Sequence, residues 1–518
     1  MNASIRVMVN TIVMYLKILV STIVTLYLTR VVLDVLGVSD FGIYNVIAGV
    51  IAVLAFLETS LMTSTQRYLS VAIGEGNDNK YRSYLNSSLI IHLIFSIIIV
   101  VLLELCGVFL FDGFLTIPPD RIQVARQVYQ LMILSTLITV ICIPYNAMIN
   151  AEEDIWFYGL WQSICIFLRL GVVFGFTVIN IDSLMLYSLW IAVTTILTGL
   201  GALVWCFCKY PQTRNCNLSW KANKSSVKDL VGFAGWNTFG SFAIVFRNQG
   251  VAVLLNHFFS PAINAVYGIA NQVNGQLASF ANTLTASMAP QIAKSYGEGN
   301  LERLRYLTVF TSKFAFFLSA VFAIPFLLEM PVILKLWLKE VPEFTEFYCG
   351  TIVYMFLMNE MYPGLTRGIQ AVGIIRNREI VSSLVIVLPI IIGASLFSFG
   401  WSHQIIVWLI LVSQFFLVLI NVYFAHKLYG LNYKKYLLEC GKFTLIYTFV
   451  YVSGYYIDSA LQNNMITLLR FFVVCGYSVI IFVILFFYIS FDRNERMSFA
   501  RLLVRIPLLN KLFKLQKS

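Results

Sequence analysis

Six basic side chains stand inside long apolar stretches of the sequence, where a charge is costly to bury. They are Lys17, Arg30, Arg169, Arg247, Lys313 and Arg470. An arginine at the centre of a membrane helix costs roughly 2.5–3.5 kcal/mol, so each of these residues calls for a counter-charge or a function. Guanidinium groups bind phosphate oxygens in bidentate fashion, and an ammonium acts as a compact point charge. The set therefore favours recognition of an anionic group.

Arg247 is the most central of the six. Asn248 and Gln249 follow it, with apolar sequence on both sides. We expect Arg247 to face a substrate, together with Lys17, or else to form a structural ion pair. The candidate partner for such a pair is Glu360, which stands in the middle of another apolar stretch. Glu360 is also the candidate for coupling to a proton or sodium gradient, because ionisable groups inside a membrane mark ion pathways.

The remaining cations lie nearer the ends of their apolar stretches. Arg30 and Arg470 stand about one turn inside the outer boundary, and Lys313 about two turns from the inner face. Their long side chains are expected to extend to the membrane surface. Arg30 also has Asp34 one turn later. For Arg169 a structural role is favoured.

The elements that carry these residues follow from the composition. Of the 518 residues, 59% are hydrophobic and 12% are charged, about half the charged share of a soluble domain. This excludes a soluble enzyme and a disordered chain. The apolar runs are long and continuous, without the alternation of barrel strands. We therefore predict an all-α, polytopic membrane bundle of about fourteen transmembrane helices.

The placement of the basic residues sets the orientation. Most of the 36 lysines and arginines fall in alternate connections, which are the inner loops if both termini are cytoplasmic. The net charge of +11 then reflects loops beside anionic membrane lipids rather than binding to nucleic acid. The nine cysteines and four histidines lack the spacing of a metal site. We expect no metal, no cofactor and no catalytic centre.

The chain contains an internal repeat. Gly74-Glu75-Gly76-Asn77 matches Gly297-Glu298-Gly299-Asn300 at a shift of 223 residues, and the same shift aligns Tyr44 with Tyr267. Because an even number of spans separates the copies, both halves have the same orientation, and a transported species binds between such halves near the midplane.

This symmetry predicts five segments. They are an N-terminal lobe (1–210), a cytoplasmic linker (211–229), a C-terminal lobe (230–428), an appended helix pair (429–490) and a basic cytoplasmic tail (491–518). In the C-terminal lobe, small and polar residues share one helical face: Gly268, Asn271, Gly275, Ala278 and Asn282. Asn271 is therefore a candidate cavity residue, and the alternative is close helix packing through small residues.

Four segments together carry a family pattern. They are Arg30–Val46 (RVVLDVLGVSDFGIYNV), Thr65–Ser70 (TQRYLS), Arg247–Val251 (RNQGV) and Gln370–Gly373 (QAVG). They resemble the O-antigen and repeat-unit flippases, the polysaccharide-export branch of the MATE-like MOP superfamily. The resemblance covers roughly residues 5 to 425.

The resemblance implies a two-lobed transporter that moves an undecaprenyl-diphosphate-linked oligosaccharide across the bacterial cytoplasmic membrane by alternating access. Cavity cations in such proteins meet the diphosphate and sugar, which assigns Lys17, Arg30 and Arg247 to the substrate here. A monomer is expected, with glycan polymerases and glycosyltransferases as partners. The chain departs from the pattern at Glu58, at Arg367 and in its number of spans, which exceeds that common in the group.

Other functions are open at this stage. A MATE-type drug or cation antiporter would place carboxylates deep in the first lobe, where the first span carries Lys17 and no acidic residue in its middle. A lipid II-type precursor flippase is a further alternative. An integral-membrane glycosyltransferase or polymerase would need a sizeable outer loop, and the predicted outer loops are short.

Overall fold

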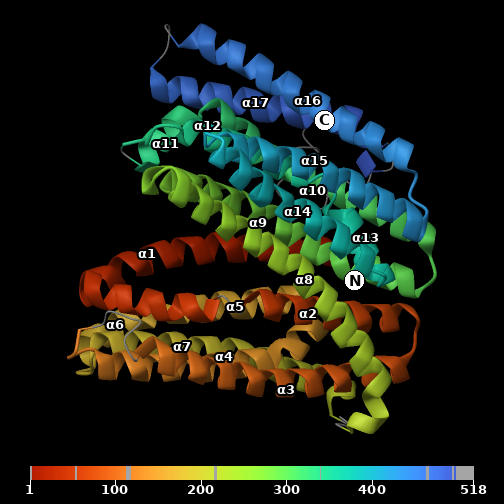
Figure 1. The fold of residues 1–518 in the computed structure, drawn as a ribbon. Helices are drawn as coiled ribbons and strands as arrows, with labels where there is room; N and C mark the ends of the chain where they lie inside the picture. Colours follow the sequence, from red (N-terminus) through yellow and green to blue (C-terminus); the bar gives the residue numbers. More distant parts are fainter. Residues whose placement is uncertain are drawn as a thin grey trace, which may run out of the picture. The chain divides into compact units, whose positions relative to one another are not determined.

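The computed structural model describes residues 3–52, 55–111, 118–214, 219–338, 340–462, 466–492 and 495–496. Within these ranges the regular elements are helical (Figure 1). The helices are α1 (Ala3–Ala52), α2 (Ala55–Gly74), α3 (Asp78–Phe109), α4 (Ile122–Ala151), α5 (Ile155–Arg169), α6 (Gly171–Val178), α7 (Ser183–Lys209), a short 3-10 helix (Pro211–Thr213), α8 (Trp220–Phe258), α9 (Pro261–Gly297), α10 (Leu301–Leu328), α11 (Met330–Leu338), α12 (Thr345–Asn359), α13 (Pro363–Val372), α14 (Arg376–Ser398), α15 (Ile405–Tyr429), α16 (Tyr433–Leu461) and α17 (Thr467–Ile489). The predicted basic tail lies almost wholly outside the described residues.

Ten helical stretches of the described chain are long and apolar enough to cross a membrane. This confirms the all-α, polytopic class. One of the other predicted spans, at 345–371, contains a break between α12 and α13. The span predicted at 9–33 and the start of the span predicted at 41–63 both lie in α1, which turns at Gly37, where a φ of 73° suits a residue without a Cβ.

The chain divides into two compact units. Unit 1 comprises Met1–Val245, Thr283–Leu307 and Arg367–Ser383, and unit 2 comprises Phe246–Asn282, Thr308–Thr366 and Leu384–Ser518. Several long helices, α8, α9, α10 and α14, therefore pass from one unit to the other. The predicted lobe boundaries remain a prediction. The predicted linker (211–229) contains the 3-10 helix and the first turns of α8.

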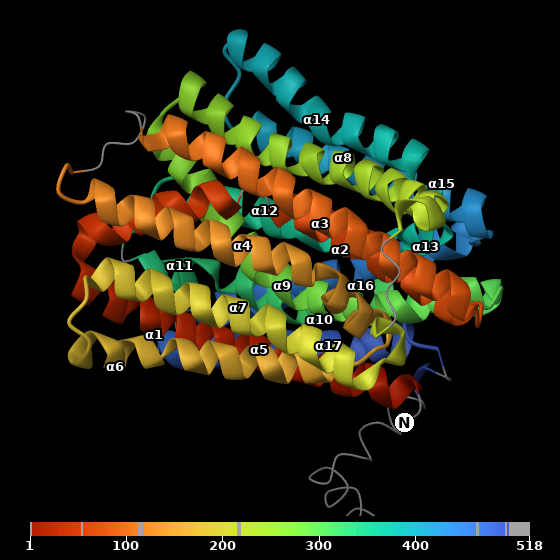
Figure 2. The same cartoon turned by 90° about the horizontal axis from the view of Figure 1, so that it is seen from below.

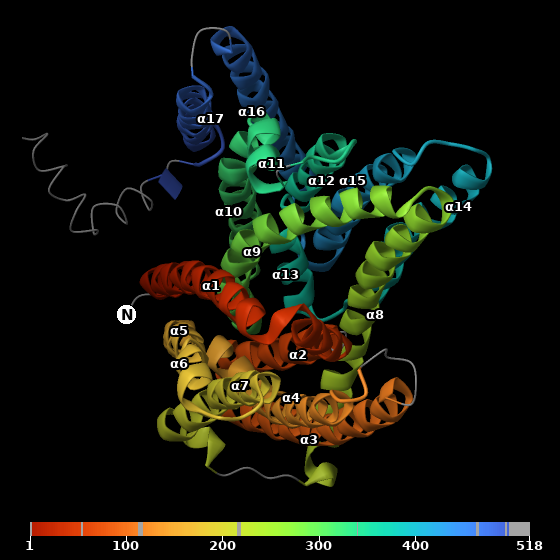
Figure 3. The same ribbon diagram turned by 90° about the vertical axis from the view of Figure 1, so that its left-hand side faces the viewer.

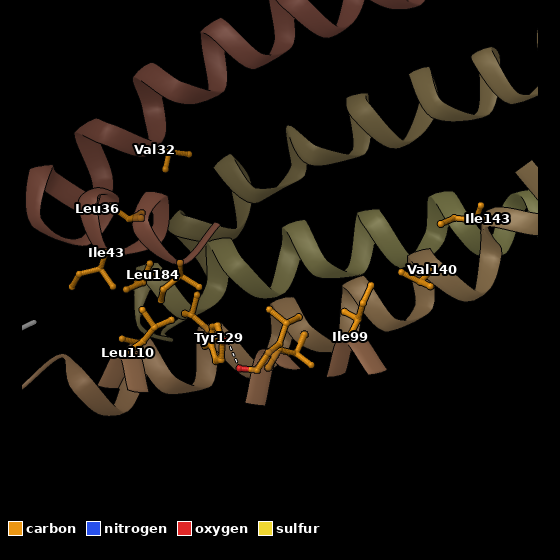
Figure 4. Packing of buried hydrophobic residues seen from close by; sticks show 14 residues of the cluster. Val32, Leu36, Ile43, Ile99, Leu110, Tyr129, Val140, Ile143 and Leu184 are labelled. Atoms are coloured by element: carbon orange, nitrogen blue, oxygen red, sulfur yellow. Dashed lines mark hydrogen bonds between the residues drawn. The ribbon is translucent and has the colours of Figure 1, made fainter. Parts of the chain in front are cut away.

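Unit 1 is built on long helices that pack lengthwise. In Figure 2, α3 lies along α4, and α1 lies along α5, as their contacts require. The core between them is apolar, with Val32, Ile99 and Leu184 at 2% exposure or less. Tyr129 packs in the same cluster, and its hydroxyl donates to the carbonyl oxygen of Leu103 (2.5 Å; Figure 4). Its one polar atom is thus satisfied inside the core.

One end of unit 1 is tied by an arginine clamp. Arg121, at the start of α4, pairs with Asp40 of α1 and with Asp182, which caps α7 (2.6 Å to Asp182). Asp182 also accepts the backbone N–H groups of Leu184 and Met185. Burial alone raises the pKa of Asp182, but the hydrogen bonds from Arg121 and these N–H groups outweigh it and hold the pKa below its ordinary value. The clamp therefore keeps this carboxyl charged.

The two Gly-Glu-Gly-Asn motifs adopt the same backbone conformation and cap the helix that follows in the same way. Gly76 (φ 64°) and Gly299 (φ 71°) make the left-handed turn. Asn77 then caps α3 by accepting the N–H of Lys80 (3.0 Å), and Asn300 accepts the N–H of Arg303 at the same distance. A glycine followed by an asparagine cap ends one helix and starts the next.

The first glycines of these motifs bring two helices into backbone contact within unit 1. A Cβ on Gly74 of α2 would lie 2.2 Å from the carbonyl oxygen of Lys294 on α9. A Cβ on Gly297 of α9 would lie 2.2 Å from the carbonyl oxygen of Val71 on α2. Val71 and Lys294 are themselves related by the repeat shift of 223 residues. The contact is therefore reciprocal, as at a two-fold axis.

A buried polar junction also joins α9 to the turn between α4 and α5. Glu153, in that turn, is 3% exposed and has a φ of 65°. Its carboxylate accepts Lys294 Nζ and Gln291 Nε2, both at 2.6 Å. Its carbonyl oxygen accepts the side-chain amide of Asn10 (2.9 Å).

Removing the cation of this junction is expected to destabilise the protein. In Lys294→Met, the buried Glu153 carboxylate loses its counter-ion, a change that costs about 3–5 kcal/mol for a buried pair. The apparent unfolding temperature of the purified protein measures the loss. Lys80→Met is the matched control, because the Lys80–Glu75 pair is exposed and such pairs contribute about 1 kcal/mol or less. Equal unfolding temperatures for the two variants contradict the assignment.

In unit 2, stacked aromatic rings attach the last two helices, α16 and α17, to α10. Phe316 of α10 stacks on Phe443 of α16 (centroids 5.2 Å apart) and on Phe486 of α17 (6.1 Å). Phe317 of α10 stacks on Phe482 of α17 (6.0 Å). Helices α16 and α17 lie side by side in Figure 3. The predicted appended pair is therefore fastened to α10.

Two cations that were expected to reach the membrane surface are instead neutralised inside unit 2. Lys313 is 3% exposed, and its Nζ lies 3.0 Å from the carboxylate of Glu495. Arg470 lies 3.1 Å from Asp458 and 3.6 Å from Glu329. That expectation is wrong, because each side chain finds an acidic partner that is remote in the sequence.

Candidate functional site

Arg247 is a half-buried residue of α8 in unit 2. Its Nε and Nη2 both donate to the Oδ1 of Asn248 (3.2 Å each). No ion pair among the described residues includes Arg247. A neutral amide orients a guanidinium without cancelling its charge, so Arg247 keeps the capacity to bind an anion.

Two residues of α9 complete the group around Arg247. Tyr267 is buried and interacts electrostatically with Arg247. The side-chain amide of Asn271 donates to the carbonyl oxygen of Tyr267 (3.0 Å). The structure thus brings three of the predicted residues, Arg247, Asn248 and Asn271, to one place in unit 2. Gln249, the fourth in this region, is exposed.

Tyr267 is a residue that the site prediction missed, although the repeat contained a signal for it. Its repeat equivalent is Tyr44, which packs against Tyr187 in unit 1 (centroids 4.8 Å apart) and interacts electrostatically with Arg169. Each half of the repeat therefore sets a tyrosine beside an arginine of an apolar stretch. Arg169, for which a structural role was favoured, belongs to this second pair.

The other two predicted cations lie on α1 in unit 1. Lys17 is half-buried and Arg30 is exposed. Neither takes part in an ion pair of the described structure, and Arg30 does not bond Asp34 one turn later. Because Arg247 belongs to unit 2, the single cavity predicted for Lys17 and Arg247 remains a prediction.

Glu360 stands at the break between α12 and α13 and is 3% exposed. Its carboxylate accepts the side-chain amide of Asn359 (3.2 Å). Asn359 in turn accepts the hydroxyl of Tyr362 (2.8 Å), which also accepts Gln414 Nε2 (2.9 Å). Glu360 thus belongs to a polar network, and in the described residues it forms no ion pair with Arg247. Its assignment to ion coupling stays a prediction.

The arrangement is suited to binding an anion. The guanidinium of Arg247 has a neutral partner, the side-chain amide of Asn248. Among the described residues, no group of three or more histidines, cysteines or carboxylates is placed to hold a metal. What the residues can do is attract, orient and release a negatively charged group.

Comparison with known proteins identifies the fold of this chain. The MatE family model matches residues 12–177, and the proteins of that family are transporters, not enzymes. No curated protein matches the sequence. The solved structure of a MATE point mutant is similar with a TM-score of 0.70 at 14% identity, covering 82% of this chain and 96% of that one.

Two further structures have similar values. One is described as the outward-facing conformation of a multidrug resistance MATE family transporter of the MOP superfamily (TM-score 0.66, 14% identity, 82% and 96% coverage). The other is a MOP superfamily transporter from Pyrococcus furiosus, described as having a binding pocket of reverse polarity that suggests a different function (TM-score 0.67, 13% identity, 82% and 96% coverage). The chain therefore has the fold of MATE transporters and is a multi-pass membrane protein.

Proposed function

We propose that this protein moves an anionic, lipid-linked oligosaccharide from the inner to the outer leaflet of a bacterial cytoplasmic membrane by alternating access. The observation that carries the proposal is Arg247, whose guanidinium is held by a neutral amide and joined to no carboxylate in the described structure. Lys17 and Arg30 are also without an ion pair there. The diphosphate of such a cargo supplies the charge that these groups lack.

A second feature supports an amphiphilic cargo. Unit 2 contains a cavity of about 310 Å³ between α10, α12, α15 and α16. Its lining is mainly apolar and includes Phe316, Leu357, Phe415 and Leu437. Ligand pockets start at about 300 Å³. A hydrocarbon chain suits this lining.

The test is reconstitution into vesicles that carry a lipid-diphosphate-linked oligosaccharide. The purified protein should expose the sugar of the inner-leaflet lipid to a membrane-impermeant lectin, and protein-free vesicles should not. Loss of the gene should lead to accumulation of complete lipid-linked repeat units, which mass analysis identifies. Vesicles in which the sugar stays protected contradict the proposal.

A MATE-type drug or cation antiporter is the second candidate, and the comparisons favour it. The MatE match and the similarity to an outward-facing multidrug resistance transporter both point to it. The Pyrococcus furiosus transporter, with its binding pocket of reverse polarity, shows in contrast that a chain of this fold can be assigned a different function. Export of a cationic dye from the same vesicles separates the two candidates, because the unpaired cations described above repel such a cargo.

Lys17 provides a graded test of cargo charge. Lys17→Glu should slow transport of the lipid-linked oligosaccharide more than Lys17→Gln, because a carboxylate repels the diphosphate whereas an amide only fails to attract it. Initial rates in vesicles measure the difference. Equal rates indicate that Lys17 acts through packing, and faster dye export by Lys17→Glu favours the antiporter.

The orientation, oligomeric state and partners of the protein complete the proposed function. We infer that both termini are cytoplasmic, in keeping with the basic loops. The protein acts as a monomer, and it passes its cargo between glycosyltransferases that build the oligosaccharide and a polymerase that consumes it.

A further inference from the structure

Arg67 and Arg367 line one small cavity inside unit 1. The cavity measures about 20 Å³, and its other lining residues are Thr63, Gln66, Ser70, Ala289, Ala293, Gln370 and Ala371. These residues come from α2, α9 and α13, which the internal repeat assigns to different halves of the chain. The lining contains two guanidinium groups, two amides and two hydroxyl groups, and it contains no carboxylate.

Arg67 donates hydrogen bonds to two backbone carbonyl groups. Its Nε and Nη2 donate to the carbonyl oxygen of Ala371 (3.2 and 3.0 Å), and Nη2 also donates to that of Val372 (3.1 Å). The chain leaves space for this group at Gly373 (φ 90°), where a Cβ would lie 2.2 Å from Nη2. Two sequence motifs, Thr65–Ser70 and Gln370–Gly373, thus meet at one side chain.

The other polar atoms of the cavity remain unused. Arg67 Nη1 and Ser70 Oγ are buried and have no hydrogen-bond partner in the described structure. Arg367 donates one hydrogen bond, from Nη1 to the amide oxygen of Gln370 (3.0 Å). Neither arginine belongs to an ion pair among the described residues. The ring of Tyr68 lies 4.2 Å from the Arg67 guanidinium. This is a cation–π contact, which attracts the guanidinium but brings no negative charge.

Arg67 and Arg367 are half-buried like charges that repel each other across the cavity, and arginine stays protonated in proteins. A water molecule would satisfy the free donors but would leave both charges uncompensated, and buried charges in proteins are paired. The occupant must therefore be negative, and it must accept hydrogen bonds. The volume of about 20 Å³ is that of one water-sized particle, so a monatomic anion fits it better than phosphate, sulfate or a carboxylate-bearing metabolite.

We propose that this cavity is a binding site for a single halide-sized anion, chloride under physiological conditions. The anion accepts hydrogen bonds from Arg67, Arg367 and Ser70, and it joins α2 and α9 to α13. Occupancy therefore stabilises the arrangement in which these segments of the two halves meet. The anion site does not depend on the identity of the transported cargo. A negative result for chloride binding therefore leaves the proposed transport function untouched, and the reverse also holds.

The experiment measures the apparent unfolding temperature of the full-length purified protein as chloride replaces gluconate at constant ionic strength. A bound ligand raises stability in a saturable manner. We expect such a rise for the wild type with chloride and with bromide, and none with sulfate. Arg82→Gln is the control for loss of an exposed arginine, and it should keep the whole response.

Arg367→Gln should abolish the response. Because that variant removes a large, half-buried group, Ser70→Ala is the milder test. It removes a single hydroxyl group, and it should raise the half-saturating chloride concentration about tenfold through loss of one donor to the ion. Equal unfolding temperatures in chloride and gluconate overturn the proposal. So does an unaltered response in Ser70→Ala and Arg367→Gln, or saturation by sulfate in place of chloride.

Discussion

Arg247→Gln is expected to reduce transport of the lipid-linked oligosaccharide by about 10- to 100-fold while leaving the amount of protein in the membrane unchanged. Hydrogen bonds to charged groups contribute about 1.5–3 kcal/mol each, and Arg247 offers a guanidinium whose partner here is a neutral amide. A glutamine cannot supply the charge. The initial rate of sugar exposure in vesicles measures the loss, and mass analysis of accumulated lipid-linked intermediates measures it in cells.

Two further variants make this result specific. Arg247→Lys should retain part of the activity, because an ammonium keeps the charge but not the bidentate geometry. Lys228→Gln removes an exposed cation from the same helix and should transport at the wild-type rate. Wild-type transport by Arg247→Gln refutes the assignment of the site, and a fall in membrane protein level instead indicates a structural role.

The second large effect is expected at the reciprocal glycines. Gly74→Ala and Gly297→Ala each place a methyl group 2.2 Å from a backbone carbonyl oxygen, well inside van der Waals contact. Because the obstacle is backbone, α2 and α9 must separate. Overpacking of this kind costs about 1–3 kcal/mol or more, so the apparent unfolding temperature should fall by several degrees for each variant.

Gly232→Ala is the matched control for both. It makes the same substitution on α8, at an exposed position with no atom within 4 Å of the new Cβ. Alanine is favoured over glycine in a helix by about 1 kcal/mol, so this variant should be as stable as the wild type or more so. Stability losses that are equal at all three positions contradict the proposed contact.

The sequence alone was sufficient for features that depend on local composition. Long apolar runs predicted the helical bundle, and the Gly-Glu-Gly-Asn repeat predicted two equivalent helix junctions, which the structure builds with Gly76 and Gly299 in the same left-handed turn. Arg247, Asn248 and Asn271 were candidates for a substrate site, and this role stays a prediction.

Features that depend on contacts between distant segments could not be read from the chain. Lys313 was assigned to the membrane surface because its partner, Glu495, lies beyond the last helix. Arg67 stands in the Thr65–Ser70 motif, and nothing in that motif indicates that it binds the carbonyl oxygen of Ala371, 304 residues away. Tertiary packing decides whether a cation is neutralised, and hydropathy contains no information about that partner.

The aromatic and ionic attachment of α16 and α17 to α10 has a consequence for the architecture of the chain. A protein cut after residue 428 would lose the ring partners of Phe316 and Phe317 and would leave the ammonium of Lys313 without its anion. A shorter protein with the same α10 sequence would therefore be less stable. The last two helices are therefore part of the packed structure of unit 2, because α10 depends on them for its ring partners and for the counter-ion of Lys313.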